Sequence, residues 1–213
     1  MQHKLVLLRH GQSIWNVEQR FTGSTDVPLT ELGVAEARRA GEMLREEGYA
    51  FDLVFTSRLS RAQQTAREAL TVMGLAEVEV RHDARLNERS FGILEGLRFV
   101  DAAARYGEQW GQPWLWGLRP EGGESLDDLM ERVRPLWQTD IHDAVTAGRK
   151  VLVVAHGNTI RAFDELLRGG HGERLDRVPT ASPLLYEWNG NTAEVKRTAF
   201  VVSNSASSAS KMA

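Results

Sequence analysis

Two segments far apart in the chain share one pattern, in which an apolar run is followed at once by a histidine and a glycine. The first segment reads LVLLRHG and ends on Arg9, His10 and Gly11, and the second reads VLVVAHG and ends on His156 and Gly157. A short and wholly apolar run is typical of a buried strand in a parallel sheet. In open α/β sheets, ligands bind outside the carboxyl ends of such strands. If these two strands are neighbours, both histidines lie at one site.

Strand and helix signals alternate along the rest of the chain. We expect strands at 4–8, 52–56, 77–80 and 151–155, a hairpin formed by 184–188 and 193–202, and helices that begin after Thr30, Ser57 and Ser125. The alternation predicts a layered α/β fold with a mostly parallel sheet flanked by helices. We expect a single domain over residues 1–202 and a disordered tail at 203–213, where serine and alanine predominate and no apolar pattern is present.

Charge and composition exclude several classes of function. The formal net charge is −3 over 213 residues, so no bulk positive field favours nucleic acid or an anionic membrane. The apolar runs are long enough for strands but too short to span a membrane. The chain has no cysteine, which excludes disulfides, thiolate zinc sites and cysteine nucleophiles. Because a strand signal begins at the N-terminus without a signal-peptide pattern, we expect a cytoplasmic protein.

Arginines accompany the two histidines. Arg9 precedes His10, and Arg61 lies at the start of the helix predicted after residue 57. Two guanidinium groups and two imidazoles suit a compact dianion such as phosphate, because arginine offers forked donors that match phosphate oxygens. Nearby cations disfavour imidazolium, so neutral His10 is the candidate nucleophile. Glu88, in LNERSFG, is the candidate acid that protonates a leaving oxygen.

Six motifs, in this order, resemble those of the histidine phosphatase superfamily, the clan of cofactor-dependent phosphoglycerate mutases and related phosphatases: LRHGQSIWN, RFTGSTDVPLTELG, FTSRLSRAQQT, LNERSFG, GGESL and AHGNTIR. The resemblance covers about residues 4–190 and implies a three-layer α/β sandwich like that of phosphoglycerate mutase. It implies that His10 is phosphorylated during turnover, that Glu88 donates the proton, and that Arg9, Arg61 and His156 hold the phosphoryl group. It implies substrate contacts from Asn16, Thr22, Gly23, Gly157 and Asn158.

The same resemblance implies no metal, because positive side chains replace it, and a small phosphorylated metabolite as the ligand. Relatives of this kind are often homodimers or tetramers, so either state is an expectation for this chain.

The resemblance leaves the activity open between two alternatives. In the mutases a lysine and two arginines grip the second anionic end of the substrate, and here Phe99, Leu115 and Trp116 take their places. Each lost charge-assisted hydrogen bond is worth roughly 1.5–3 kcal/mol, and Arg98 and Arg119 are the nearby cations that could compensate. We therefore expect a phosphomonoester phosphatase with no cofactor. The alternative is a 2,3-bisphosphoglycerate-dependent phosphoglycerate mutase, which needs 2,3-bisphosphoglycerate as a primer.

Two readings come from other classes of protein. His10, His156 and Glu88 have the two-histidine, one-carboxylate composition of a metal site, but the adjacent arginines would repel a cation. A module that senses phosphorylated ligands without turnover is the other, but it would need neither a nucleophile nor an acid.

Overall fold

The computed structural model describes residues 2–111, 118–169, 174–190 and 195–200, and its centre is one sheet of six strands. The strands are β1 (His3–Arg9), β2 (Leu53–Thr56), β3 (Glu79–His82), β4 (Val151–Ala155), β5 (Pro183–Trp188) and β6 (Lys196–Ala199). Their order across the sheet is β3-β2-β4-β1-β5-β6. The first four strands pair in parallel, whereas β5 is antiparallel to both β1 and β6. The sheet is therefore mostly parallel, as predicted.

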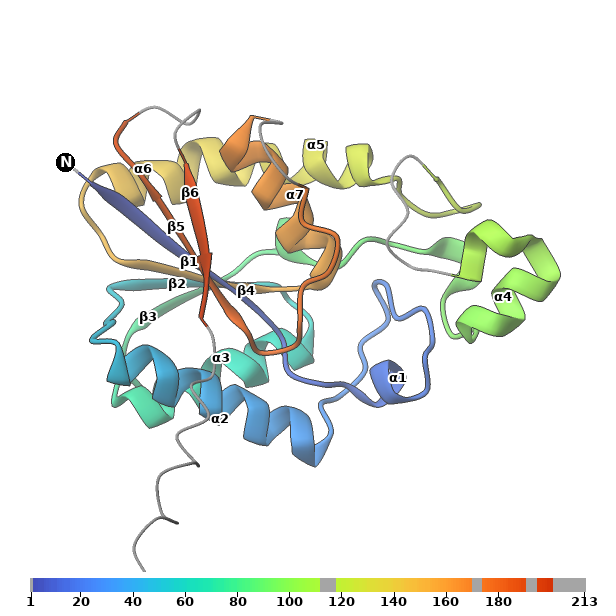
Figure 1. The fold of residues 1–213 in the computed structure, drawn as a ribbon, viewed down its shortest axis with the longest axis horizontal. Helices are drawn as coiled ribbons and strands as arrows, with labels where there is room; N and C mark the ends of the chain where they lie inside the picture. The colour runs from blue at the N-terminus through green and yellow to red at the C-terminus, as the bar shows by residue number, and fades with distance from the viewer. Residues whose placement is uncertain (1, 112–117, 170–173, 191–194, 201–213) are drawn as a thin grey trace, which may run out of the picture.

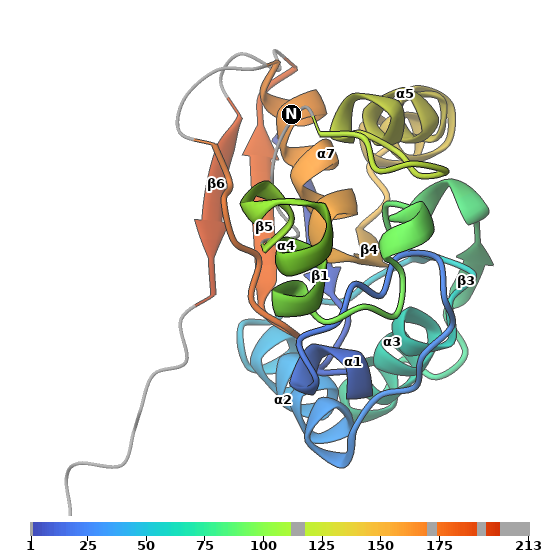
Figure 2. The ribbon, with the colours of Figure 1, turned by 90° about the vertical axis from the view of Figure 1, so that its right-hand side faces the viewer.

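Helices cover both faces of this sheet (Figure 1). The helices are α1 (Ile14–Val17), α2 (Glu31–Glu46), α3 (Ser60–Met73), α4 (Phe99–Tyr106), α5 (Leu126–Leu136), α6 (His142–Thr146) and α7 (Gly157–Arg168), with 3-10 turns η1 (Ala84–Leu86), η2 (Gly92–Leu94) and η3 (Glu108–Gly111) and a π-helical turn η4 (Trp137–Ile141). α2 and α3 lie on one face, and α5, α6 and α7 lie on the other. α1 and α4 lie beyond the ends of the strands (Figure 2). The three-layer sandwich is confirmed.

The alternation of side chains along the strands explains why two apolar layers form. Leu5 and Leu7 of β1 point to the side of α5 and α7, where they pack in one buried cluster with Phe163. Val6 and Leu8 point to the opposite side, into a second buried cluster that contains Leu44 of α2. Because side chains alternate along a strand, each wholly apolar strand supplies both layers at once.

The pairing of β1 with β4 positions the site. Arg9 pairs with Ala155 at the last position of the register, so the two strands end level with each other. The His10 amide also donates to the carbonyl of Ala155 at 2.9 Å. His10 and His156 therefore leave the same edge of the sheet from neighbouring strands, as the repeated pattern predicts.

Several sequence-based boundaries differ from the structure by a few residues, and those of β3 and α3 have a clear physical reason. β3 covers residues 79–82 rather than 77–80, because its pairing with β2 sets Leu53 opposite Glu79. All four β3 side chains are exposed, so no buried face fixes that register in the sequence. α3 begins at Ser60 after Leu59, which makes no side-chain capping bond, and Ser57 instead accepts a hydrogen bond from the Leu59 amide at 3.2 Å.

Other local expectations are confirmed. Thr30 and Ser125 are the N-caps of α2 and α5, and β5 pairs with β6 as a hairpin from Leu184–Ala199 to Glu187–Lys196. The hairpin residues 191–194, the tail 203–213, and Leu115 and Trp116 lie outside the described residues. The single domain over 1–202 stays a prediction. None of the helices in the described ranges is long and apolar enough to cross a membrane.

Candidate active site

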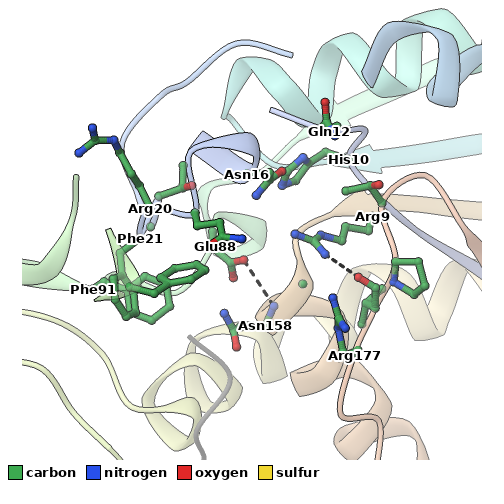
Figure 3. A pocket seen from close by; sticks show the side chains of 18 of the residues that line it. Arg9, His10, Gln12, Asn16, Arg20, Phe21, Glu88, Phe91, Asn158 and Arg177 are labelled. Atoms are coloured by element: carbon green, nitrogen blue, oxygen red, sulfur yellow. Dashed lines mark hydrogen bonds between the residues drawn. The ribbon is translucent and has the colours of Figure 1, made fainter. Parts of the chain in front are cut away.

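A cavity of about 750 Å³ opens at the carboxyl ends of β1 and β4 (Figure 3). Most of the predicted site residues line it: Arg9, His10, Asn16, Thr22, Gly23, Arg61, Glu88, Gly157 and Asn158. His156 is fully buried beside His10, with the two ring centroids 5.0 Å apart. The fold thus brings together residues from five separate segments of the chain.

The hydrogen bonding of His10 occupies one ring nitrogen, Nδ1. Its Nδ1 lies 2.7 Å from the carbonyl oxygen of Gly11. A carbonyl only accepts, so in the neutral ring Nδ1 carries the hydrogen and Nε2 keeps its lone pair. Burial lowers the pKa of His10 well below its ordinary value, and the charges of Arg61 and Arg9 lower it further. The ring is therefore neutral at pH 7, with Nε2 available to attack an electrophile.

His156 has a different set of partners. Its Nδ1 accepts a hydrogen bond from Nε of Arg61 at 3.3 Å, because a guanidinium only donates. Nε2 therefore carries the hydrogen and donates to Oγ of Ser57 at 2.8 Å. Burial, followed by the charge of Arg61, lowers the pKa of His156 well below its ordinary value. Both ring nitrogens are engaged inside the protein, so in this geometry His156 orients Arg61.

Two buried arginines flank the histidines. Arg61 donates to the carbonyls of Gly23 and Thr25, each at 2.8 Å, and burial lowers its pKa to about 10, so it is charged at neutral pH. Arg9 donates from Nη1 to the carbonyl of Val178 at 2.6 Å. Its Nε is buried and has no hydrogen-bond partner among the residues described. An oxyanion in the cavity would satisfy this donor and remove its desolvation cost.

The carboxyl group of Glu88 is held by backbone amides. Oε1 accepts from the amide of Arg89 at 2.9 Å, and Oε2 lies 3.4 Å from the amide of Asn158 (Figure 3). Asn158 is the second residue of α7, where helix amides point away from the helix. The longer contact leaves Oε2 as the oxygen better placed to exchange a proton with a bound molecule.

The glycines of the motifs differ in how closely other protein atoms pack against them. A Cβ on Gly11 would lie 2.1 Å from the carbonyl oxygen of Gly33, so these two segments touch only as glycines. Gly23 has φ +53° and a Cβ there would lie 2.1 Å from Oε1 of Glu95. A Cβ on Gly157 would meet its nearest protein atoms at an ordinary 3.6 Å. Gly157 therefore leaves room for a ligand and is not required by packing.

A carboxylate that sequence reasoning missed connects two loops of the site. Glu95 accepts from the amides of Ser24 and Thr25 at 3.1 and 3.2 Å and from the amide of Phe91 at 3.0 Å. The loop that contains Ser24 and Thr25 also supplies the two carbonyls, of Gly23 and Thr25, that accept hydrogen bonds from Arg61. No spacing rule links Glu95 to residues 70 positions earlier, so the sequence carries no signal for this contact.

One wall of the cavity is apolar. Phe91 and Phe99 both pack edge-on against Phe21, with centroid distances of 4.9 Å. The two arginines expected to compensate for the missing cations are engaged elsewhere. Arg98 binds Asp101 through two hydrogen bonds of 2.7 and 2.9 Å, and Arg119 pairs with Asp128, and neither is among the described residues that line the cavity.

Other cations that the sequence analysis did not select do line the cavity: Arg20, Arg161 and Arg177. Arg161 is buried and donates from Nη1 to Oδ1 of Asn158 at 3.0 Å. It follows Asn158 by three positions on α7, a spacing that could have marked it as a neighbour. Arg177 lies near enough to Arg9 to help lower the pKa of Arg9, although burial is the larger cause. Figure 3 shows Arg177 beside Arg9 and Asn158.

Comparison with known proteins matches this arrangement to one family. The model of the histidine phosphatase superfamily (branch 1) matches residues 5–200. The chain belongs to the histidine phosphatase superfamily. This confirms the resemblance carried by the six motifs.

Similar members of the superfamily fall into two groups. A 2,3-bisphosphoglycerate-dependent phosphoglycerate mutase of Methylobacterium radiotolerans is 45% identical over 93% of this chain and 95% of its own. The mutase of Mesorhizobium japonicum is 43% identical over 90% and 95%. The solved structures include a mycobacterial glucosyl-3-phosphoglycerate phosphatase (29% identity, 94% of this chain, 98% of that chain, TM-score 0.74) and the α-ribazole phosphatase of Shigella flexneri (26%, 88%, 91%, 0.70).

The two-histidine, one-carboxylate metal site has no counterpart in the geometry. Within the described ranges, no group of three or more His, Asp or Glu side chains is arranged to hold a metal ion. His10 and His156 instead direct three ring nitrogens to protein groups.

Proposed function

We propose that this protein is a phosphomonoester phosphatase that acts on a small phosphorylated metabolite through a phosphohistidine intermediate. The observation that carries the proposal is the shared cavity of His10 and Glu88. A neutral imidazole with a free Nε2 and a carboxyl group whose Oε2 makes only one long amide contact line the same cavity, with Arg9 and Arg61 beside them. This set supplies a nucleophile, an acid and an anion clamp in one place.

In the first step, Nε2 of His10 attacks the phosphorus atom and the bond from phosphorus to the ester oxygen breaks. The carboxyl group of Glu88 gives its proton to that oxygen, so a neutral alcohol leaves. Arg9 and Arg61 bind the equatorial oxygens, whose charge they stabilise throughout the transfer. Since these guanidinium groups carry the positive charge, the mechanism requires no metal ion.

In the second step, water attacks phosphorus, the nitrogen–phosphorus bond breaks, and the Glu88 carboxylate takes the proton from water. Inorganic phosphate leaves and the starting protonation states return. His156 acts by holding Arg61 through its Nδ1. The remaining contacts to phosphate or substrate are proposed for Asn16, Thr22, Gly23, Gly157 and Asn158, all of which line the cavity.

The apolar wall favours water over a second phosphorylated acceptor. A mutase must hold an anion at each end of its bisphosphate, and here Phe99 stands on the cavity where a lysine would. Arg98 and Arg119 are paired with Asp101 and Asp128. The chain has Phe99, Leu115 and Trp116 in place of the lysine and two arginines of the mutases. The absence of those three cations weakens retention of the intermediate, because each charge-assisted hydrogen bond contributes roughly 1.5–3 kcal/mol. The similar solved structures named above as phosphatases support the same choice.

The second candidate is a 2,3-bisphosphoglycerate-dependent phosphoglycerate mutase. Identity of 43–45% to curated mutases over most of the chain favours it. Arg161 and Arg177 line the cavity, and in this case they are the residues proposed to contact the second anion. In this case 2,3-bisphosphoglycerate would be the primer that phosphorylates His10.

One pair of assays on a single preparation separates the two. Phosphate release is measured over a panel of phosphomonoesters that includes 3-phosphoglycerate. Conversion of 3- to 2-phosphoglycerate is measured with and without 2,3-bisphosphoglycerate. We expect phosphate release and little isomerisation. Efficient primed isomerisation, with phosphate release as a minor reaction, would assign the protein to the mutases. A homodimer or tetramer and a cytoplasmic location stay predictions.

A further inference from the structure

The loop that carries Glu88 is gripped from outside the cavity by one arginine of α5. Arg132 donates hydrogen bonds to four backbone carbonyls between residues 84 and 88 and to one carboxylate. From Nη1 it reaches the carbonyls of Ala84 (3.2 Å), Arg85 (2.9 Å) and Asn87 (3.2 Å), and from Nη2 that of Glu88 (3.3 Å). The guanidinium thus binds the backbone on the N-terminal side of the acid and at the acid itself.

Glu124, just before α5, completes this grip. Its carboxylate accepts from Nε and Nη2 of Arg132, both at 2.8 Å, and from the amide of Ser90 at 2.9 Å. Its own amide donates to the carbonyl of Ser90 at 2.9 Å. Burial raises the pKa of Glu124, but the hydrogen bonds from Arg132 and Ser90 outweigh it and hold that pKa below its ordinary value. The pair therefore fixes the backbone on both sides of Glu88.

We infer that Arg132, oriented by Glu124, is a positioning residue for the general acid Glu88. The inference rests on the proposed function, in which Glu88 protonates the leaving oxygen. A carboxyl group reaches that oxygen only within hydrogen-bond distance, and a displacement of about 1 Å can cost roughly 100-fold in rate. Among the described residues, the Glu88 side chain accepts hydrogen bonds from two backbone amides. Its place therefore depends on the backbone, which Arg132 holds together with Thr159, whose Oγ1 donates to the carbonyl of Asn87 at 3.0 Å.

The anion clamp, formed by Arg9 and Arg61, is held by other contacts than the Glu88 loop. Arg9 is held by Val178, and Arg61 by Gly23, Thr25 and His156. Arg132 is absent from the described residues that line the cavity. Loosening the grip therefore disturbs protonation of the leaving group and leaves binding of the phosphoryl group in place.

The test compares kcat/KM for an alkyl phosphate and for p-nitrophenyl phosphate in wild type and in Arg132→Met. This ratio reports on events up to departure of the alcohol, so later attack by water does not obscure it. An alkoxide needs a proton, whereas nitrophenolate leaves without one. We expect a loss of about 10- to 100-fold for the alkyl ester and less than about threefold for the nitrophenyl ester. Competitive inhibition by vanadate should be unchanged.

Further variants make the result specific. Arg134→Met removes an arginine of the same helix that pairs with Glu131 at 3.0 Å, and it should change neither ester. Arg132→Lys keeps the charge but lacks the fork, so its alkyl-ester loss should lie between wild type and Arg132→Met. If Arg132→Met does not fold, as judged by circular dichroism, Arg132→Lys and Glu124→Gln carry the comparison.

Equal losses for both esters, or no loss for either, would overturn the role of Arg132 while leaving the phosphatase proposal intact. Wild-type protein that hydrolyses neither ester would instead overturn the proposed function, and the role of Arg132 with it.

Discussion

The two buried histidines make the free energy of unfolding depend on pH around and below neutrality. His10 and His156 have pKa values well below 6.5 in the folded protein, because burial and the neighbouring arginines disfavour imidazolium. In the unfolded chain both rings titrate near 6.5. Below that pH the unfolded state binds protons that the folded state does not bind. Acidification therefore stabilises the unfolded state and lowers the free energy of unfolding.

The size of the effect follows from the proton count. Between pH 7.5 and 5.5, protonation of two unfolded-state histidines removes up to about 3 kcal/mol from the free energy of unfolding, half from each ring, when both folded-state rings stay neutral over that range. Stability for a domain is typically about 5–15 kcal/mol, so the loss is measurable. With a urea dependence of about 2–3 kcal/mol per molar, the midpoint of unfolding should fall by about 1 M. Asp83 and Glu124, whose hydrogen bonds from arginine side chains hold their pKa values below the ordinary 3.8 and 4.5, contribute only below this window.

The assay is urea unfolding of wild type, His10→Gln, His156→Gln and the double variant at pH 7.5, 6.5 and 5.5. Each single variant should lose half of the pH dependence and the double variant nearly all of it. A wild-type midpoint that does not move between pH 7.5 and 5.5, or single variants with the full wild-type dependence, would refute the reasoning that both rings are buried and neutral.

Three further predictions concern single residues of the site. His10→Ala should abolish turnover and the acid-labile phosphoenzyme formed from a radiolabelled donor; phosphoenzyme that persists would place the nucleophile elsewhere. Glu88→Gln should lower kcat/KM for alkyl phosphates by roughly 10²- to 10⁴-fold and spare p-nitrophenyl phosphate, and equal losses would remove its role as the acid. Gly23→Ala should cost about 1–3 kcal/mol, because its φ is positive and a Cβ would meet Glu95. Thermal unfolding should show a lower Tm by about 2–4 °C per kcal/mol, whereas Gly157→Ala, with ordinary contacts, should leave Tm nearly unchanged.

Much of the fold and the centre of the site are local properties of the sequence. The apolar runs before His10 and His156 each predict a strand buried on both faces, a pattern typical of parallel sheets. Parallel strands bring their carboxyl ends to one edge, so the repeated pattern predicts that the two histidines meet if their strands are neighbours, and the pairing of β1 with β4 makes them neighbours. Thr30 and Ser125 likewise mark helix starts, because an N-cap acts on amides only a few residues away.

The tertiary structure alone decided which cations and carboxylates serve the site. The sequence analysis selected Arg98 and Arg119 as cations that could compensate for the missing ones. In the structure they form ion pairs with Asp101 and Asp128 instead. Arg177 carries no local signal, and it reaches the cavity because the segment before β5 returns past the end of β1.

The same holds for the contacts that hold the acid. Arg132 and Glu124 meet the Glu88 loop across about 40 positions of chain. Hydrogen bonds between residues so far apart in the chain depend on how helices and strands pack against one another. Helical periodicity and capping rules describe only residues a few positions apart, so they do not predict such bonds. The sequence therefore identifies the candidate nucleophile, the candidate acid and the strands that bear the histidines, whereas the packing of α5 against the sheet brings Arg132 and Glu124 to the loop that carries Glu88.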